Sequence, residues 1–200
     1  MVLVVPRAKQ RTPELRERVL AHAVELLARE GAAGFPARSI AREAQTSTPA
    51  VYELFGDTSG VVREVFFEGF RLLRAALDTL VPSSDPRSDL VAVAAIYRRF
   101  VAENPVLAEV MFSRPFTDFD PAPSELQAGA AVRVLIVRHV RRCLAAGVLR
   151  GEETDIAYAL LALMQGLAAA ESARRLGTGR RSIDRRWQLA VDALIDGLAP

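Results

Sequence analysis

The segment from Ala37 to Gly56 constrains the fold of this chain more than any other feature of the sequence. It predicts two short helices, at about 37–44 and 48–55, that are joined by the turn Gln45-Thr46-Ser47. Helices that cross so closely need a small residue where they touch and apolar residues at fixed offsets to hold the crossing angle. The spacing therefore predicts a helix-turn-helix over about residues 37–56. The small contact residue is Ala41. The other apolar positions are Ile40, Ala44, Val51 and Leu54.

The remainder of the chain also has helical periodicity, without a convincing strand pattern and without a long internal repeat. The first helix should begin after Thr12, whose hydroxyl can cap it, with Pro13 in its first turn, and it should end at Gly31. The sequence therefore predicts an all-α protein with a small N-terminal three-helix unit and a larger helical body. The body helices are expected at about 57–80, 88–104, 105–113, 124–146, 153–176 and 183–198.

The composition sets limits on partners and on location. Half of the 200 residues are apolar, so the chain can bury a sizeable core. The formal net charge of +2 is too small to attract nucleic acid over a long range, so DNA binding must come from a local arrangement of charge. Cys143 is the only cysteine, which excludes an intrachain disulfide. The apolar runs are too short for a membrane span and the N-terminus lacks the features of a signal peptide, so we expect a soluble cytoplasmic protein.

An all-α enzyme is an alternative that few sequence features support. His22 and His139 are the only histidines, and neither belongs to a metal-binding cluster or a catalytic triad. Cys143 follows two arginines that can activate a thiol, but it has no clear base nearby. A proline-flanked loop explains the acids of Asp118-Phe119-Asp120. Because no phosphate-binding loop, dinucleotide fingerprint or zinc-protease signature is present, we expect no enzyme, no metal site and no cofactor.

Motifs around the predicted helix-turn-helix form a combined pattern that is more specific than any one of them. They are Ser39-Ile40-Ala41-Arg42-Glu43-Ala44, then Ser47, Val51-Tyr52 and Phe55-Gly56-Asp57. Together with Leu26–Gly31 at the end of the first helix, this pattern resembles the TetR family of regulators, the TetR/AcrR-like helix-turn-helix repressors. The resemblance is good over about residues 12–68, and beyond them it extends only to length and helical character.

Two positions depart from the family pattern. Gln45 stands where the family usually has glycine, because the turn favours a left-handed backbone, and a residue with a Cβ there costs on the order of 1 kcal/mol. Thr58 stands where the family commonly has a lysine that contacts a phosphate, so we expect weaker or less salt-sensitive DNA binding. These departures and an uncharged recognition surface leave open a second function class, a helical protein-interaction adaptor that has lost DNA binding.

The resemblance implies a transcription regulator, and in particular a repressor that binds double-stranded DNA and is released by a small lipophilic ligand. It divides the chain into a basic N-terminal arm at 1–11, a helix-turn-helix DNA-binding domain at 12–58 and a helical effector-binding and dimerisation domain at 59–200. Because one such unit contacts few base pairs, we expect a homodimer on a pseudo-palindromic operator. Pairing is expected through about 153–198, where small and apolar residues recur. The alternative is that these helices only line the monomer core.

The predicted recognition helix offers no arginine or lysine, so the common bidentate contact to guanine is not available from it. Hydroxyl groups near its N-terminus can anchor phosphates, and positive charge can come from Arg38 or from the basic segment 7–11. That segment can enter a minor groove, or it can be a disordered terminus without a role in binding. The predicted DNA-binding residues are Arg11, Arg38, Ser39, Thr46, Ser47, Thr48, Pro49, Ala50, Tyr52 and Thr58.

Bulky aromatic and methionine residues recur near the middle of the chain, as is typical of an adaptable apolar cavity between helices. The resemblance implies that this domain binds a small effector that shifts the spacing of the DNA-binding units. Few charges fall among these positions, so we expect the effector to be apolar. Ordinary core packing is the alternative for each of these residues. The predicted ligand-binding residues are Tyr97, Phe100, Met111, Phe112, Phe116, Phe119 and Met164.

Overall fold

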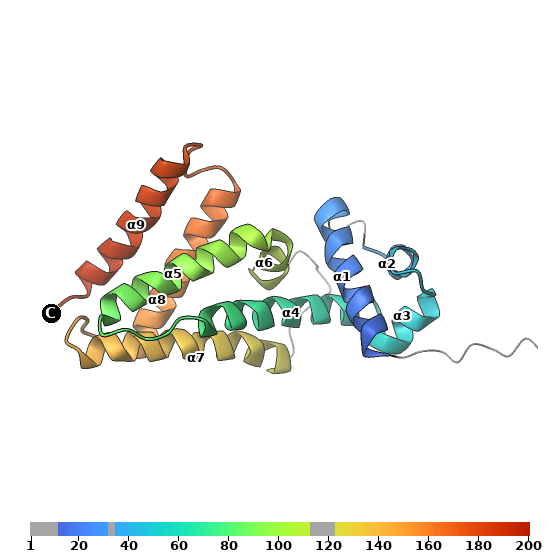
Figure 1. Cartoon of the computed structure of the whole chain (residues 1–200), viewed down its shortest axis with the longest axis horizontal. Helices are drawn as coiled ribbons and strands as arrows, with labels where there is room; N and C mark the ends of the chain where they lie inside the picture. Colours follow the sequence, from blue (N-terminus) through green and yellow to red (C-terminus); the bar gives the residue numbers. More distant parts are fainter. Residues whose placement is uncertain (1–11, 32–34, 113–122) are drawn as a thin grey trace, which may run out of the picture.

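A computed structural model describes residues 12–31, 35–112 and 123–200, apart from the side chains of 124–126. Within these ranges the chain forms nine α-helices and no strand, which confirms the all-α prediction (Figure 1). None of these helices is long and apolar enough to cross a membrane. The N-terminal unit contains α1 (Pro13–Glu30), α2 (Ala37–Glu43) and α3 (Thr48–Phe55). The body contains α4 (Thr58–Asp78), α5 (Pro86–Glu103), α6 (Pro105–Phe112), α7 (Pro123–Ala145), α8 (Glu153–Ser172) and α9 (Arg180–Gly197).

Polar side chains cap the N-termini of α1, α3 and α4, close to where the sequence predicts that these helices start. The Thr12 hydroxyl and the Ser47 hydroxyl each accept a hydrogen bond from the backbone N–H three residues later, at 3.3 Å. Asp57 Oδ1 accepts the corresponding bond in α4 at 2.7 Å. The first turn of a helix leaves backbone donors without a partner, and these caps satisfy one of them in each helix. The three residues therefore determine where these helices start.

The turn between α2 and α3 has the left-handed backbone that the family pattern predicts. Gln45 occupies it with a φ of 51°. The Gln45 N–H donates to the Arg42 carbonyl at 3.2 Å, and the Thr46 N–H donates to the Ala41 carbonyl at 2.9 Å. This pair of hydrogen bonds is a Schellman motif, which closes the C-terminus of α2. Gln45 therefore carries a backbone strain that glycine would avoid.

Buried small and apolar side chains hold the crossing of α2 and α3, as the spacing predicts. Ile40, Ala44 and Val51 are fully buried, and Ala41 is 3% exposed. Leu54 is half-buried and packs against the same core. The inner faces of both helices are thus committed to the fold, which leaves their other faces to solvent.

Helix α4 joins the N-terminal unit to the body and packs against helices of both (Figure 1). At its start, Gly60 lies so close to α3 that an added Cβ would be 1.7 Å from the Phe55 carbonyl oxygen. Further along, Gly69 meets α6, and an added Cβ would be 2.4 Å from Met111 Sδ. Because glycine has no side chain, α4 approaches the α3 backbone at Gly60 more closely than any other residue would permit, whereas at Gly69 the neighbour is the flexible Met111 side chain.

Helices α8 and α9 lie toward the end of the molecule opposite α2 and α3 (Figure 1). Arg98 of α5 contacts both of them, with hydrogen bonds of 2.8 Å to both carboxylate oxygens of Glu171 and of 2.8 Å to Asp184. Trp187 Nε1 donates to Glu171 at 2.6 Å. The hydrogen bond from Arg98 is the main cause that lowers the pKa of Glu171. This charged cluster joins α5, α8 and α9.

Replacing Gln45 with glycine should stabilise the protein. The left-handed strain of a residue with a Cβ is roughly 1–2 kcal/mol, and it exceeds the entropy that glycine adds to the unfolded chain, roughly 0.5–1 kcal/mol. We expect the melting temperature to rise by about 2 °C, measured by calorimetry. Gln45→Ala is the matched control, because it removes the exposed amide but keeps the Cβ, and it should give no rise. An equal rise in both variants would show that backbone strain is not the cause.

Candidate functional site

The outer face of α3 is exposed while its inner face is buried. Val51 is fully buried and Phe55 is 9% exposed, whereas Tyr52 is 45% exposed. Pro49 is exposed and Thr48 is half-buried at the start of the helix. Tyr52 and Pro49 therefore lie on the exposed face of α3, and α3 itself lies with α2 at one end of the molecule (Figure 1).

The other predicted DNA-binding residues lie on α2, on the turn and at the start of α4. Arg11 lies outside the described residues. All the predicted residues within the described ranges are at least partly exposed. They are Arg38, Ser39, Thr46, Ser47, Thr48, Pro49, Ala50, Tyr52 and Thr58.

Arginines near the motif differ in whether an acid neutralises them. Arg29 pairs with Glu43 at 3.3 Å, and Arg42 lies 3.9 Å from the same carboxylate. Arg38 is exposed at the start of α2 and forms no ion pair with any described residue. Its guanidinium is therefore the charge in α2 that is available to a phosphate or a base.

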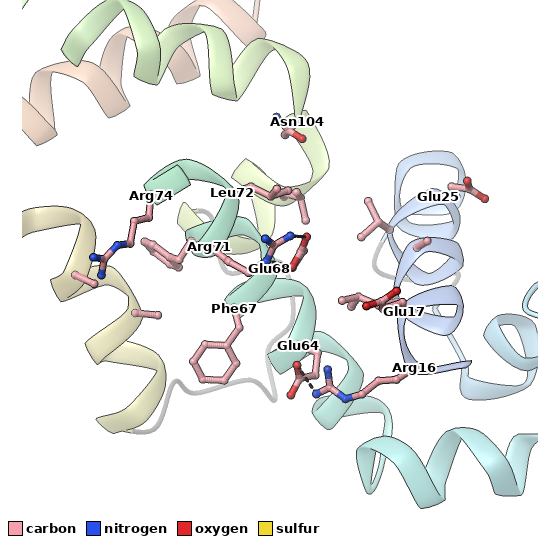
Figure 2. Close-up of a pocket in the computed structure, with 17 residues that line it drawn as sticks. Arg16, Glu17, Glu25, Glu64, Phe67, Glu68, Arg71, Leu72, Arg74 and Asn104 are labelled. Carbon is pink, nitrogen blue, oxygen red and sulfur yellow. Dashed lines mark hydrogen bonds and ion pairs between the residues drawn. The ribbon is translucent and has the colours of Figure 1, made fainter. Parts of the chain in front are cut away.

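A groove of about 990 Å³ separates α1 from α4. Figure 2 shows Arg16 of α1 extended toward Glu64 of α4, and the two side chains are 2.6 Å apart. Arg16 also lies 5.3 Å from the centre of the Phe55 ring in α3. Along α4, Arg71 pairs with Glu68 at 2.5 Å. Arg16 thus connects α1, α3 and α4 at the junction between the N-terminal unit and the body.

A cavity of about 330 Å³ lies in the body between α4, α5, α6, α7 and α8. This volume is near the lower end of the range for pockets that bury a small molecule. Three of the predicted ligand-binding residues line it, namely Tyr97, Met111 and Phe112. Other lining residues that the sequence did not single out are Phe66, Phe70, Leu73, Gly129, Val132, Arg133, Tyr158, Leu161, Ala162 and Gln165. The i, i+4 spacing of Phe66 and Phe70 on one helix face is the signal that indicates them.

The remaining predicted ligand-binding residues lie elsewhere. Phe100 is buried and lines a separate cavity of about 290 Å³ together with Leu72 and Ile96. Met164 is fully buried in the core and does not line the 330 Å³ cavity. Phe116 and Phe119 lie outside the described residues. The structure thus brings Tyr97, Met111 and Phe112 together at one cavity, places Phe100 at another and buries Met164 in the core.

Tyr97 is the buried polar residue of this region. Its ring centre is 5.9 Å from that of Phe112, which in turn is 6.0 Å from that of Phe70. Tyr97 is 1% exposed, and its hydroxyl has no hydrogen-bond partner in the described part of the chain. Burial raises the pKa of the phenol above its ordinary value, so the hydroxyl stays protonated. Tyr97 and Phe112 also line a neighbouring cavity of about 390 Å³, so Tyr97 stands between two cavities.

Cys143 and His139, two residues considered for catalysis in the sequence, lie in the interior, and Asp118 and Asp120 lie outside the described residues. Cys143 is fully buried, its thiol donates to the Pro86 carbonyl at 3.1 Å, and burial raises its pKa to about 11. His139 is also buried, and its pKa is lowered first by desolvation and then by the charge of Arg138. Across the described ranges, no group of three or more His, Cys, Asp or Glu side chains could hold a metal ion.

Two family models match the chain in the regions that form this geometry. One, described as bacterial regulatory proteins of the tetR family, matches residues 19–65, and these contain α2, α3 and most of α1. The other, described as the C-terminal domain of tetracyclin repressor-like proteins, matches residues 90–194, just over half of the chain. The chain belongs to the TetR family. As a TetR-family member it is a ligand-responsive, DNA-binding regulator of transcription, and this family is one of regulators rather than enzymes.

Solved structures share the TetR fold over nearly the whole chain. A protein of unknown function from Rhodococcus sp. RHA1 is 29% identical, with a TM-score of 0.82, over 96% of this chain and 98% of its own. The TetR-family regulator PfmR from Thermus thermophilus is 19% identical, with a TM-score of 0.71, over 92% and 97%. The fatty acid degradation regulator FadR from Bacillus halodurans is 12% identical, with a TM-score of 0.76, over 93% and 96%. No curated protein sequence matches the chain significantly.

Cys143 should react slowly with Ellman's reagent in the native protein. Because burial raises its pKa to about 11, the thiolate fraction at pH 8 is about 100-fold below that of an exposed thiol, and access is blocked as well. We expect the native reaction to be at least about 100-fold slower than the reaction in guanidinium chloride, which is the control. The native rate should still rise with pH between 8 and 10. Equal rates in both solvents would contradict the buried placement of the thiol.

Proposed function

We propose that this TetR-family protein is a repressor, which binds a pseudo-palindromic operator as a homodimer and leaves DNA when a small lipophilic molecule binds its body. The observation that carries the proposal is the orientation of α3, with Val51 buried and Tyr52 exposed. An α-helix can enter the major groove when its outer side chains are free to reach base edges and phosphates. We therefore assign 12–58 to DNA binding and 59–200 to effector binding and dimerisation.

The proposed DNA contacts divide into phosphate anchors and base contacts. Arg38 supplies the charge, because it is exposed and has no acid partner in the described ranges. The Ser47 hydroxyl accepts the capping bond of α3, so its own proton is available to a phosphate oxygen. Thr58 places a hydroxyl at the N-terminus of α4, where the helix dipole favours anions. Pro49 and Ala50 offer apolar contact to thymine methyl groups.

The proposed homodimer forms through α8 and α9. Large apolar side chains are exposed on both helices, with Tyr158 51% and Leu189 68% exposed. On α8, the small residues Ala159, Ala162 and Gly166 are exposed next to Tyr158, and small residues let helices approach closely. A two-fold symmetric homodimer formed through α8 and α9 presents two copies of α3, one from each subunit. Successive major grooves accept two such helices when they are about 34–36 Å apart.

The proposed effector site is the 330 Å³ cavity, whose lining is mostly apolar. Phe70 lines both this cavity and the groove between α1 and α4. A ligand that displaces Phe70 therefore acts on the side of α4 that faces the N-terminal unit. Glu64 lies on the same helix and holds Arg16 of α1, so a shift of α4 changes the orientation of the N-terminal unit. The ligand releases DNA if it binds more tightly to the conformation in which the two α3 helices no longer match the grooves.

Arg38→Ala and Tyr52→Phe should each weaken operator binding without affecting the fold. We expect about a tenfold loss for Arg38→Ala, because an arginine contact contributes roughly 1–3 kcal/mol, and a smaller loss for Tyr52→Phe. The measurement is fluorescence anisotropy with DNA from upstream of the protein's own coding region, at several salt concentrations. The slope of log K against log salt should become less steep by about 1 for Arg38→Ala. Arg99→Ala, which removes an exposed arginine of α5, is the control. No salt-sensitive binding by the unaltered protein would favour the adaptor hypothesis.

Leu189→Arg should split the homodimer, because it places a charge without a partner in the proposed apolar contact. Sedimentation velocity should show a monomer with an unchanged circular dichroism spectrum. Operator affinity should fall by about 100-fold, since the two recognition units no longer bind as one. Val81→Arg is the matched control, because Val81 is also an exposed aliphatic residue, at 81%, but lies in the segment after α4. If Leu189→Arg remained a dimer, the interface would have to lie elsewhere.

A further inference from the structure

We propose that the 330 Å³ cavity selects amphipathic anions, with Arg133 pairing with the negative group of the ligand and Tyr97 donating a hydrogen bond to the same polar end. This inference rests on the effector function proposed above and deepens it. It narrows the ligand from any small lipophilic molecule to one that carries a carboxylate, or another single negative charge, on an apolar body.

Arg133 of α7 is the only charged residue among the described residues that line the cavity. It is half-buried, and its guanidinium carbon lies 5.2 Å from the centre of the Tyr158 ring, which also belongs to the lining. Within the described part of the chain it forms no ion pair and no side-chain hydrogen bond. A stacked aromatic ring satisfies the positive charge only in part, and the N–H donors of the half-buried guanidinium remain available to a ligand. The described lining therefore carries one positive charge with no described acid beside it.

Tyr97 provides a second, independent observation in the same cavity. Its hydroxyl is buried and lacks a partner among the described residues, and its side chain lines both this cavity and the 390 Å³ cavity, so a ligand reaches the hydroxyl only when neighbouring side chains move. A buried hydroxyl without a partner is costly, and a ligand oxygen that accepts its proton removes that cost. Because burial keeps the phenol protonated, Tyr97 can donate to an anion instead of repelling it.

The rest of the lining limits the kind of anion. The walls are formed by aliphatic and aromatic side chains such as Phe66, Leu73 and Leu161, and no acidic residue is among the lining residues that the structure describes. With one positive charge and no acid in the described lining, the cavity favours a single negative charge over a cation. A sugar phosphate or a nucleotide would leave most of its polar groups without partners against these walls. An aliphatic or aromatic monocarboxylate can pair with Arg133 through its carboxylate and contact the apolar lining through its hydrocarbon part.

Three probes with the same hydrocarbon chain test the charge preference: octanoate, 1-octanol and octylammonium, titrated into the full-length protein by calorimetry at pH 7.5. We expect octanoate to bind at least about tenfold more tightly than octanol, and octylammonium to bind more weakly than both. Arg133→Gln should lower octanoate affinity about tenfold and leave octanol affinity within about twofold. Arg133→Lys should retain part of the preference, because it keeps the charge but loses the bidentate geometry. Arg138→Gln, an exposed position on the same helix, is the control and should retain the preference in full.

Tyr97→Phe tests the second contact without changing the shape of the ring. It should lower octanoate affinity several-fold and leave the melting temperature of the ligand-free protein equal or higher, because it removes a buried hydroxyl that lacks a partner among the described residues. A role in packing alone would lower the melting temperature and leave the affinity unchanged. That result would overturn the assignment of Tyr97.

The proposal is overturned if octanol or octylammonium binds as tightly as octanoate, if none of the three probes binds, or if Arg133→Gln lowers all affinities equally. Tight binding of octanol would leave the proposed repressor function intact, because that function requires only a lipophilic ligand. Conversely, operator binding by the ligand-free protein tests the repressor function without involving Arg133. The two proposals can therefore fail separately.

Discussion

The packing of α4 against both halves of the molecule is the constraint on which the rest of the structure depends. Gly60 brings its start against the Phe55 carbonyl, and Gly69 brings its middle against α6. Protein interiors are packed too densely to absorb a displacement locally, so a helix held this closely moves with its neighbours or not at all. The surface formed by α3 and the cavity in the body thus share one rigid element, although they lie in different parts of the chain.

Features that depend on a few neighbouring residues could be predicted from the sequence. Capping by Thr12 follows from a hydrogen bond within three residues, whereas the left-handed backbone at Gln45 was indicated by the resemblance to the TetR family. The end of α8 shows where this approach loses accuracy. The sequence predicts helix to about 176, because the next glycine is Gly177, but the helix ends at Ser172 and Arg174 takes a φ of 56°. An arginine gives no local signal for a left-handed backbone.

The site was less predictable, because a cavity is defined by the arrangement of distant segments. Met164 packs in the core and Phe100 lines a different cavity from Tyr97, and periodicity alone cannot separate a core position from a lining position. The sequence could not indicate Arg133 as a ligand contact, because that role depends on there being no acid beside it among the described residues, which only the structure reveals. The resemblance in the sequence was apparent only to about residue 68, because the body has no motif of fixed spacing. The family model that matches residues 90–194 shows that the similarity to the family also covers most of the body.

The strained backbone at Gln45 has a consequence for how the protein tolerates mutation. Gln45, in its exposed turn, lowers the free energy of unfolding by on the order of 1 kcal/mol, and a single substitution to glycine would restore that stability. Genetic selections that begin with a weakened α2 or α3, for example one with a truncated side chain at Ile40, should therefore recover revertants at position 45. Such second-site suppressors would restore function without touching the original lesion, because they act on the stability of the unit as a whole.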